Sequence, residues 1–188
     1  MSADHVHTTQ RIFRSVLAAV SHPGRLMLID EPVDAPRDLG SALAAAALAL
    51  FDREVTIWIA APERSRAASW LVARTGCRLA QDPAQAQFAL ILAPEDALPL
   101  ARWHPGTAED PEQSATLMVR VDDCAEGPGV TLAGPGIEHS VTARLRGITP
   151  RFWCDWSANT SLYPMGIDCL FFDDRHVVGL PRTTRAIS

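Results

Sequence analysis

The chain contains no lysine, and all 17 of its basic residues are arginine. A Schiff base with pyridoxal phosphate needs a lysine amine, so the sequence excludes that chemistry on any side chain. A P-loop ends in Gly-Lys-Ser/Thr and is excluded for the same reason. We therefore expect no lysine-linked pyridoxal phosphate and no P-loop nucleotide site, and we predict no cofactor for this chain.

Long apolar runs and paired cysteine motifs are also missing. No stretch approaches the roughly 18 uncharged apolar residues of a membrane span, and the opening "MSADHVHTTQ" lacks the order of a secretory signal. We expect a cytoplasmic protein that does not enter a membrane. The four cysteines form no C-x-x-C pair, which argues against a zinc or redox motif.

Charge and motif patterns exclude further classes. A net charge of −5 argues against a nucleic-acid surface, which needs a clustered positive field. The G-x-S-x-G elbow of many hydrolases is absent. His5 and His7 form an H-x-H pair, but the spacing identifies no third ligand. We expect no metal site and no nucleic-acid partner.

The first half of the chain alternates between helix and strand patterns. The strand "FALILA" is apolar throughout, which is typical of a sheet covered on both faces. The sequence therefore predicts an α/β fold with three layers, α/β/α, around a mixed sheet. Strands are predicted over 26–29, 54–60 and 88–93. Helices are predicted from Thr8 or Thr9 to Pro23-Gly24, over 34–51 with Asp34 as the cap, and from Pro62 to Gly76.

After residue 101 the chain changes to short strands separated by glycine, proline and acidic turns. We expect this half to be largely antiparallel, with one helix near 151–159. Because neither half has enough core alone, the sequence predicts one domain, 1–188. The strands are predicted over 116–121, 130–134, 141–147, 169–173 and 176–180.

Two motifs carry candidate site residues. "TLAGPGIEHS" places Gly134 and Gly136 around a proline, either as a phosphate cradle or as a turn between strands, and the turn is favoured. "LPRTTR" presents Arg182 and Thr183 at a strand end, either as a group suited to a carboxylate or phosphate or as an exposed C-terminal arm, and the arm is favoured. An arginine held there suits an anion or partner contact better than core packing. Asp168 begins an apolar strand, so its carboxylate is paired with an arginine or satisfied by N–H groups.

Five stretches together resemble one known family, the H-subunit family (PhnH) of the bacterial carbon-phosphorus lyase core complex. The resemblance implies a fold similar to the large domain of pyridoxal-phosphate-dependent transferases, trimmed and without the cofactor. The family's Ser-Arg-Pro-Gly turn reads Ser21-His22-Pro23-Gly24 here. The stretches are "FRSVLAAVSHPGR", "GTAEDPEQSATL", "LAGPGIE", "SANTSLYPMGIDCLFFD" and "LPRTT".

The resemblance also implies a function in phosphonate catabolism. In the family's pathway, the G, H, I and L subunits convert ATP and an alkylphosphonate, such as methylphosphonate, into a ribose 1-phosphonate 5-triphosphate. Another subunit, with an iron-sulfur cluster, breaks the carbon-phosphorus bond. We expect a homodimer that is inactive alone and assembles with the G, I and J subunits.

The ligand and the partner surface leave alternatives open. Gly134, Gly136, Asp168, Arg182 and Thr183 form a candidate composite site for a phosphonate or nucleotide. A free-standing small-molecule binder is the first rival, and a self-sufficient transferase or hydrolase is disfavoured because no nucleophile has an evident base. One crowd of apolar residues indicates either a partner surface or a dense local core. It consists of Phe152, Trp153, Trp156, Leu162, Tyr163, Phe171 and Phe172.

Overall fold

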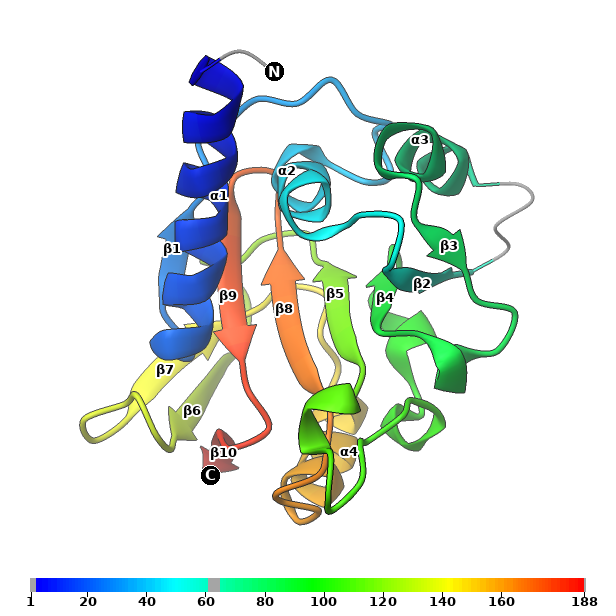
Figure 1. Cartoon of the computed structure of the whole chain (residues 1–188). Helices are drawn as coiled ribbons and strands as arrows, with labels where there is room; N and C mark the ends of the chain where they lie inside the picture. Colours follow the sequence, from blue (N-terminus) through cyan, green and yellow to red (C-terminus); the bar gives the residue numbers. More distant parts are fainter. Residues whose placement is uncertain (1–2, 61–64, 188) are drawn as a thin grey trace.

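The computed structural model describes residues 3–60 and 65–187 of the 188-residue chain (Figure 1). The α-helices are α1 (Ala3–Ser21), α2 (Ser41–Leu50), α3 (Arg66–Thr75) and α4 (Pro150–Thr160). Short 3₁₀ helices are η1 (Pro83–Gln85), η2 (Pro94–Ala97), η3 (Leu100–Arg102) and η4 (Pro111–Gln113). The strands are β1 (Leu26–Leu28), β2 (Thr56–Ile59), β3 (Arg78–Leu79), β4 (Phe88–Ile91), β5 (Thr116–Arg120), β6 (Gly129–Ala133), β7 (Val141–Arg144), β8 (Asp168–Phe172), β9 (His176–Leu180) and β10 (Arg185–Ile187).

Seven strands form one mixed sheet in the order β1-β9-β8-β5-β4-β2-β3. The strands from β8 to β3 pair in parallel, whereas β9 is antiparallel to both β8 and β1. Figure 1 shows β8 and β5 pointing one way and β9 the other. The prediction of an α/β fold with a mixed sheet is confirmed.

The second half is less antiparallel than we predicted. β5 lies between β4 and β8 and is parallel to both, so the prediction is wrong for this strand. The segment from β6 to α4 leaves the large sheet after β5, and the chain then re-enters it as β8 in the same direction. The prediction is right for the β8–β9 hairpin and for the small antiparallel sheet β10-β6-β7.

Both faces of the large sheet are covered. On β5, Met118 faces the core beneath α1, α2 and α3, whereas Leu117 and Val119 face the opposite core. This alternation follows from the two-residue period of a strand, and it explains why the central strands are apolar on both sides. The opposite core is closed by α4 with Trp156, by η3 with Leu100, and by the small sheet.

The second helix is shorter than predicted. Residues 34–40 form an extended segment and a turn, and α2 begins at Ser41 after Gly40. Gly40 has a φ of 72°, and a Cβ there would overlap the guanidinium of Arg120. Asp34 is therefore not the helix cap. This tertiary contact overrides a local pattern that is typical of a helix start.

The other helix ends agree better with the sequence. α1 ends at Ser21, before the predicted Pro23-Gly24 stop, but it begins well before Thr8. Gly76 closes α3 in the left-handed conformation, as predicted. Pro62, the predicted start of α3, lies outside the described residues. The hydroxyl of Ser65 caps α3 by accepting the N–H of Ala68 at 3.2 Å.

Candidate functional site

Arg182 and Asp168 form an ion pair at the amino-terminal edge of the large sheet's parallel strands. Asp168 is the first residue of β8, and Arg182 follows the end of β9. The backbone N–H of Arg182 donates to Asp168 Oδ1 at 2.7 Å, and Nη2 donates to Oδ2 at 2.5 Å. Only 13% of the Arg182 side chain and 28% of the Asp168 side chain are exposed. Both arrangements that the sequence allowed for Asp168 are present: its carboxylate pairs with an arginine, and it accepts a hydrogen bond from a backbone N–H.

The remaining N–H groups of Arg182 also donate to protein atoms. Nη1 reaches the carbonyl oxygens of Pro111 at 2.7 Å and Pro164 at 3.4 Å. Nη2 also bonds the hydroxyl of Ser114, and Nε bonds Asp168 Oδ1 at 3.2 Å. A guanidinium has five N–H donors, and each one finds an acceptor here. In this structure the donors of Arg182 are used within the protein, so its contact with an external anion or partner stays a prediction.

Gly134 and Gly136 lie in the turn that joins β6 to β7, so the predicted turn is confirmed. A Cβ on Gly134 would lie 2.7 Å from the carbonyl oxygen of Thr183, and one on Gly136 would lie 2.5 Å from that of Ser21. The φ angle is 152° at Gly134 and 83° at Gly136. Glycine is needed here because other backbone segments pack against the turn.

Four of the five motif stretches meet at the segment from Leu180 to Thr184, which is itself one of them. Arg182 bonds two of the stretches, through Pro111 and Ser114 in one and through Pro164 and Asp168 in the other. Gly134 places the third stretch against Thr183. Gly136 connects the same turn to the end of α1. We call this arrangement the motif junction.

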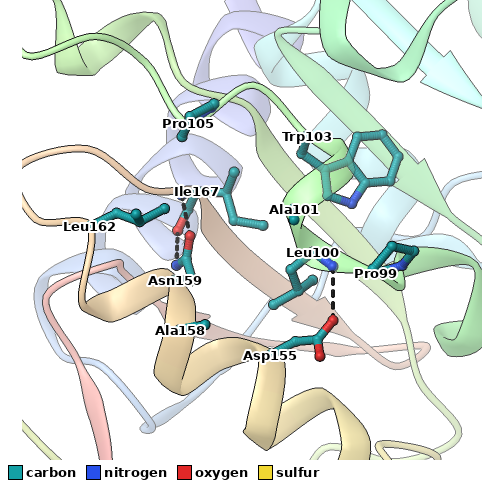
Figure 2. Close-up of a pocket in the computed structure, with 10 residues that line it drawn as sticks. All are labelled: Pro99, Leu100, Ala101, Trp103, Pro105, Asp155, Ala158, Asn159, Leu162 and Ile167. Carbon is teal, nitrogen blue, oxygen red and sulfur yellow. Dashed lines mark hydrogen bonds between the residues drawn. The ribbon is translucent and has the colours of Figure 1, made fainter.

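A pocket of about 420 Å³ adjoins the motif junction, between η3 and α4 (Figure 2). Asn159 closes one side: its Nδ2 donates to the carbonyl of Ile167 at 3.0 Å, and its Oδ1 accepts the N–H of Ile167 at 2.8 Å. At another side, Asp155 Oδ2 accepts the N–H of Leu100 at 3.1 Å. The pocket is lined by Pro99, Leu100, Ala101, Trp103, Pro105, Asp155, Ala158, Asn159, Leu162 and Ile167.

The crowd of large apolar residues is mainly a local core. Phe152, Trp156, Phe171 and Phe172 are fully buried, so the dense core that the sequence allowed is correct for them. Trp153 is partly buried. Leu162 and Tyr163 differ, because 43% and 66% of their surfaces are exposed.

A second polar cluster lies at the opposite, carboxyl-terminal edge of the parallel strands, and the sequence analysis missed it. The Asp173 carboxylate accepts hydrogen bonds from the backbone N–H of Cys124 at 3.1 Å and from that of His176 at 2.7 Å. His176 Nδ1 also lies 3.1 Å from Asp173 Oδ2. Burial raises the pKa of Asp173, but hydrogen bonds from Arg175, Cys124 and His176 outweigh it and leave the pKa below its ordinary value.

Cys124 in this cluster is not an activated nucleophile. Burial and the nearby Asp173 charge raise the pKa of its thiol far above the ordinary value. The thiol donates to the carbonyl oxygen of Phe171 at 3.7 Å. A nucleophilic cysteine needs a lowered pKa, so this arrangement supports loop fixation rather than catalysis.

The described residues provide no group of three or more His, Cys, Asp or Glu side chains that could hold a metal ion. The side chain of His5, one half of the H-x-H pair in the sequence, is outside what the structure describes. Over the same ranges, no helix combines the length and apolar character needed to cross a membrane.

The fold and the motif junction define an α/β protein whose distant motifs are joined at the amino-terminal edge of its parallel strands. The sequence model of the family "Bacterial phosphonate metabolism protein (PhnH)" matches residues 2–187. The chain belongs to this family, as its motifs predicted.

Two relatives support the family assignment. The chain is 30% identical to the "alpha-D-ribose 1-methylphosphonate 5-triphosphate synthase subunit PhnH" of Rhizobium meliloti, over 97% of this chain and 92% of the relative. It is 34% identical to the "putative C-P lyase subunit protein HtxG" of Stutzerimonas stutzeri, over 93% of this chain and 84% of the relative.

Proposed function

We propose that this chain is a subunit of the carbon-phosphorus lyase system for phosphonate catabolism. With partner subunits, it takes part in forming ribose 1-methylphosphonate 5-triphosphate from ATP and methylphosphonate. The names of the two relatives support this function. The observation that carries it is the motif junction, since the stretches that resemble the family also form one connected structure.

We propose that the subunit contributes to assembly and has no activity alone. The ion pair of the motif junction lies at the amino-terminal edge of the parallel strands, whereas open α/β sheets bind ligands at the carboxyl-terminal edge. Cys124, near that second edge, holds a protonated thiol. Neither edge presents an activated nucleophile among these residues.

A ligand-binding role for Gly134, Gly136, Asp168, Arg182 and Thr183 stays a proposal. A phosphonate or nucleotide phosphate would have to replace a protein acceptor of Arg182. The carbonyl of Pro164 is the most replaceable, because its 3.4 Å hydrogen bond is the longest of the set. To test this role, the melting temperature of the chain would be measured at increasing concentrations of methylphosphonate.

We further propose that the mixed sheet is a trimmed version of the large domain of pyridoxal-phosphate-dependent transferases. The seven-stranded sheet with helices on both faces supports this proposal. We also propose that the chain forms a single domain and works in the cytoplasm, where ATP is available. The absence of lysine means that the original cofactor linkage is lost.

A homodimer is proposed through the outer face of α1. Phe13, Leu17 and Val20 are exposed on that helix and recur at helical spacing. Such a stripe is self-complementary across a two-fold axis. Light scattering should give twice the monomer mass for the native chain and the monomer mass for Leu17→Asp.

Growth on methylphosphonate tests the proposed function. A strain that lacks the gene should fail to grow with methylphosphonate as the sole phosphorus source, and a restored copy should rescue it. Growth on inorganic phosphate is the control and should not change. Equal growth on methylphosphonate with and without the gene would contradict the proposal.

A free-standing small-molecule binder is the second candidate. The pocket beside Asn159 favours it, because its volume of about 420 Å³ lies within the usual range for small ligands. That function requires a stable complex with a small molecule in the absence of other subunits. Native mass spectrometry of the chain purified from phosphate-starved cells would detect one.

A further inference from the structure

The pocket of Figure 2 has an apolar interior and an apolar rim. Trp103 and Ile167 line it and are buried, whereas Leu162 at its edge is 43% exposed. The next residue, Tyr163, is 66% exposed. Exposed aromatic and aliphatic side chains beside a hydrophobic pocket are typical of protein interfaces, where a partner removes them from water.

The β4–β5 connection, which supplies part of the pocket's lining, is acidic in composition. It spans residues 92–115 and contains one arginine, Arg102, against several carboxylates. The Arg102 guanidinium stacks on the rings of Trp58 and Trp103, at 4.8 Å and 5.0 Å from their centroids. The acidic residues of the connection are Glu95, Asp96, Glu109, Asp110 and Glu112.

Asp155 brings a further negative charge into the pocket wall. The N–H of Leu100 anchors its Oδ2 at 3.1 Å, which fixes the carboxylate. Within 3–60 and 65–187, no residue donates a hydrogen bond to its second oxygen. A partly exposed carboxylate with a free oxygen favours a cation or an N–H donor beside it.

We propose that this pocket docks a segment of a partner subunit. The segment inserts one large apolar side chain between η3 and α4 and places an arginine or lysine against Asp155. Charge complementarity determines this choice of occupant, because the Asp155 carboxylate in the pocket wall repels a phosphonate or a triphosphate and attracts a basic chain. The inference rests on the proposed function, which supplies the partner subunits.

Co-purification with the G, I and J subunits tests the docking site. Ala158 is exposed on α4 and lines the pocket, so Ala158→Trp should fill the pocket without disturbing the core. The matched control is Ala73→Trp, at an exposed alanine of α3 beneath the other face of the sheet. We expect at least a tenfold loss of co-purified subunits for Ala158→Trp and none for the control, with both variants melting like the native chain.

Asp155→Asn tests the charge separately. The amide oxygen can still accept the Leu100 N–H, so the local structure should persist while the negative charge is removed. Binding should weaken several-fold at low salt, and the difference from the native chain should shrink at high salt. Equal binding at low salt would overturn the proposed contact between Asp155 and a basic side chain.

The outcomes separate the two proposals. If the native chain fails to co-purify with the G, I and J subunits, both the proposed function and the docking site are wrong. If the native chain and Ala158→Trp co-purify equally, only the docking site is wrong. A nucleobase is the competing occupant: adenosine that binds the isolated native chain but not Ala158→Trp would also overturn the docking site.

Discussion

Arg182 and Asp168 are joined by three hydrogen bonds, from the backbone N–H, Nε and Nη2 of the arginine to the two carboxylate oxygens. The pair connects the chain after β9 to the start of β8. Because Arg182 also bonds Pro111, Ser114 and Pro164, its loss would release the β4–β5 connection and the α4–β8 loop together.

Arg182→Ala should destabilise the fold strongly. The substitution leaves the Asp168 carboxylate, 28% exposed, without its cation and removes the other hydrogen bonds of the guanidinium, so we expect a loss of about 1–3 kcal/mol. Urea unfolding measures the change. Arg185→Ala is the control, because Arg185 is exposed on β10 and should change stability by less than about 0.5 kcal/mol. Equal stability of both variants would contradict the structural role of the Arg182–Asp168 pair.

Gly134→Ala should destabilise the chain more than Gly147→Ala. Both glycines have a positive φ, 152° and 102°, so both substitutions strain the backbone. Only at Gly134 would the new Cβ lie 2.7 Å from a backbone oxygen, whereas at Gly147 its nearest neighbour lies at 3.5 Å. We expect a difference in unfolding free energy of about 1–3 kcal/mol. Similar losses for the two variants would remove the argument for close packing at the turn.

The Asp173 cluster should make stability sensitive to acid. The folded-state pKa of Asp173 lies below its ordinary value of 3.8, so the folded state binds the proton less readily than the unfolded state. Its contribution is complete above pH 3.8 and is lost as the pH falls through the lower folded-state pKa. Asp173→Asn should therefore lower the free energy of unfolding near neutral pH. The free energy of unfolding of this variant should also fall less in acid than that of the native chain. An unchanged acid profile would contradict this assignment.

Cysteine labelling should distinguish Cys154 from the other three cysteines. Cys154 is exposed, whereas Cys77, Cys124 and Cys169 are buried and burial raises the pKa of each thiol. The thiolate is the reactive form, so iodoacetamide at neutral pH should modify Cys154 first. Peptide mass spectrometry identifies the site, with the urea-unfolded chain as the control. Rapid modification of Cys124 in the folded chain would indicate an activated thiol.

Local signals predicted much of the fold. The left-handed Gly76 closes α3 as expected, and the Gly134–Gly136 turn joins two antiparallel strands as expected. Both are governed by the conformational freedom of glycine, which can be read from a short stretch. The start of α2 was missed because Arg120, far away in the chain, packs against Gly40.

The candidate site was predicted only in part, for the same reason. Pairing of Asp168 with an arginine was one expected outcome, since a carboxylate in an apolar strand needs a partner. The other acceptors of Arg182 include the carbonyl oxygens of Pro111 and Pro164. Every residue has a carbonyl, so no residue type marks these contacts in a sequence. The Asp173–Cys124 hydrogen bond was missed because its residues are 49 positions apart.

Reconstitution of the synthase from purified subunits tests the central proposal most directly. ATP, methylphosphonate and the G, I and L subunits would be combined with and without this chain, and ribose 1-methylphosphonate 5-triphosphate measured by phosphorus NMR. The account predicts product only when this chain and its partners are present together. Product formed at the same rate without this chain, or by this chain alone, would contradict its role as an assembly subunit.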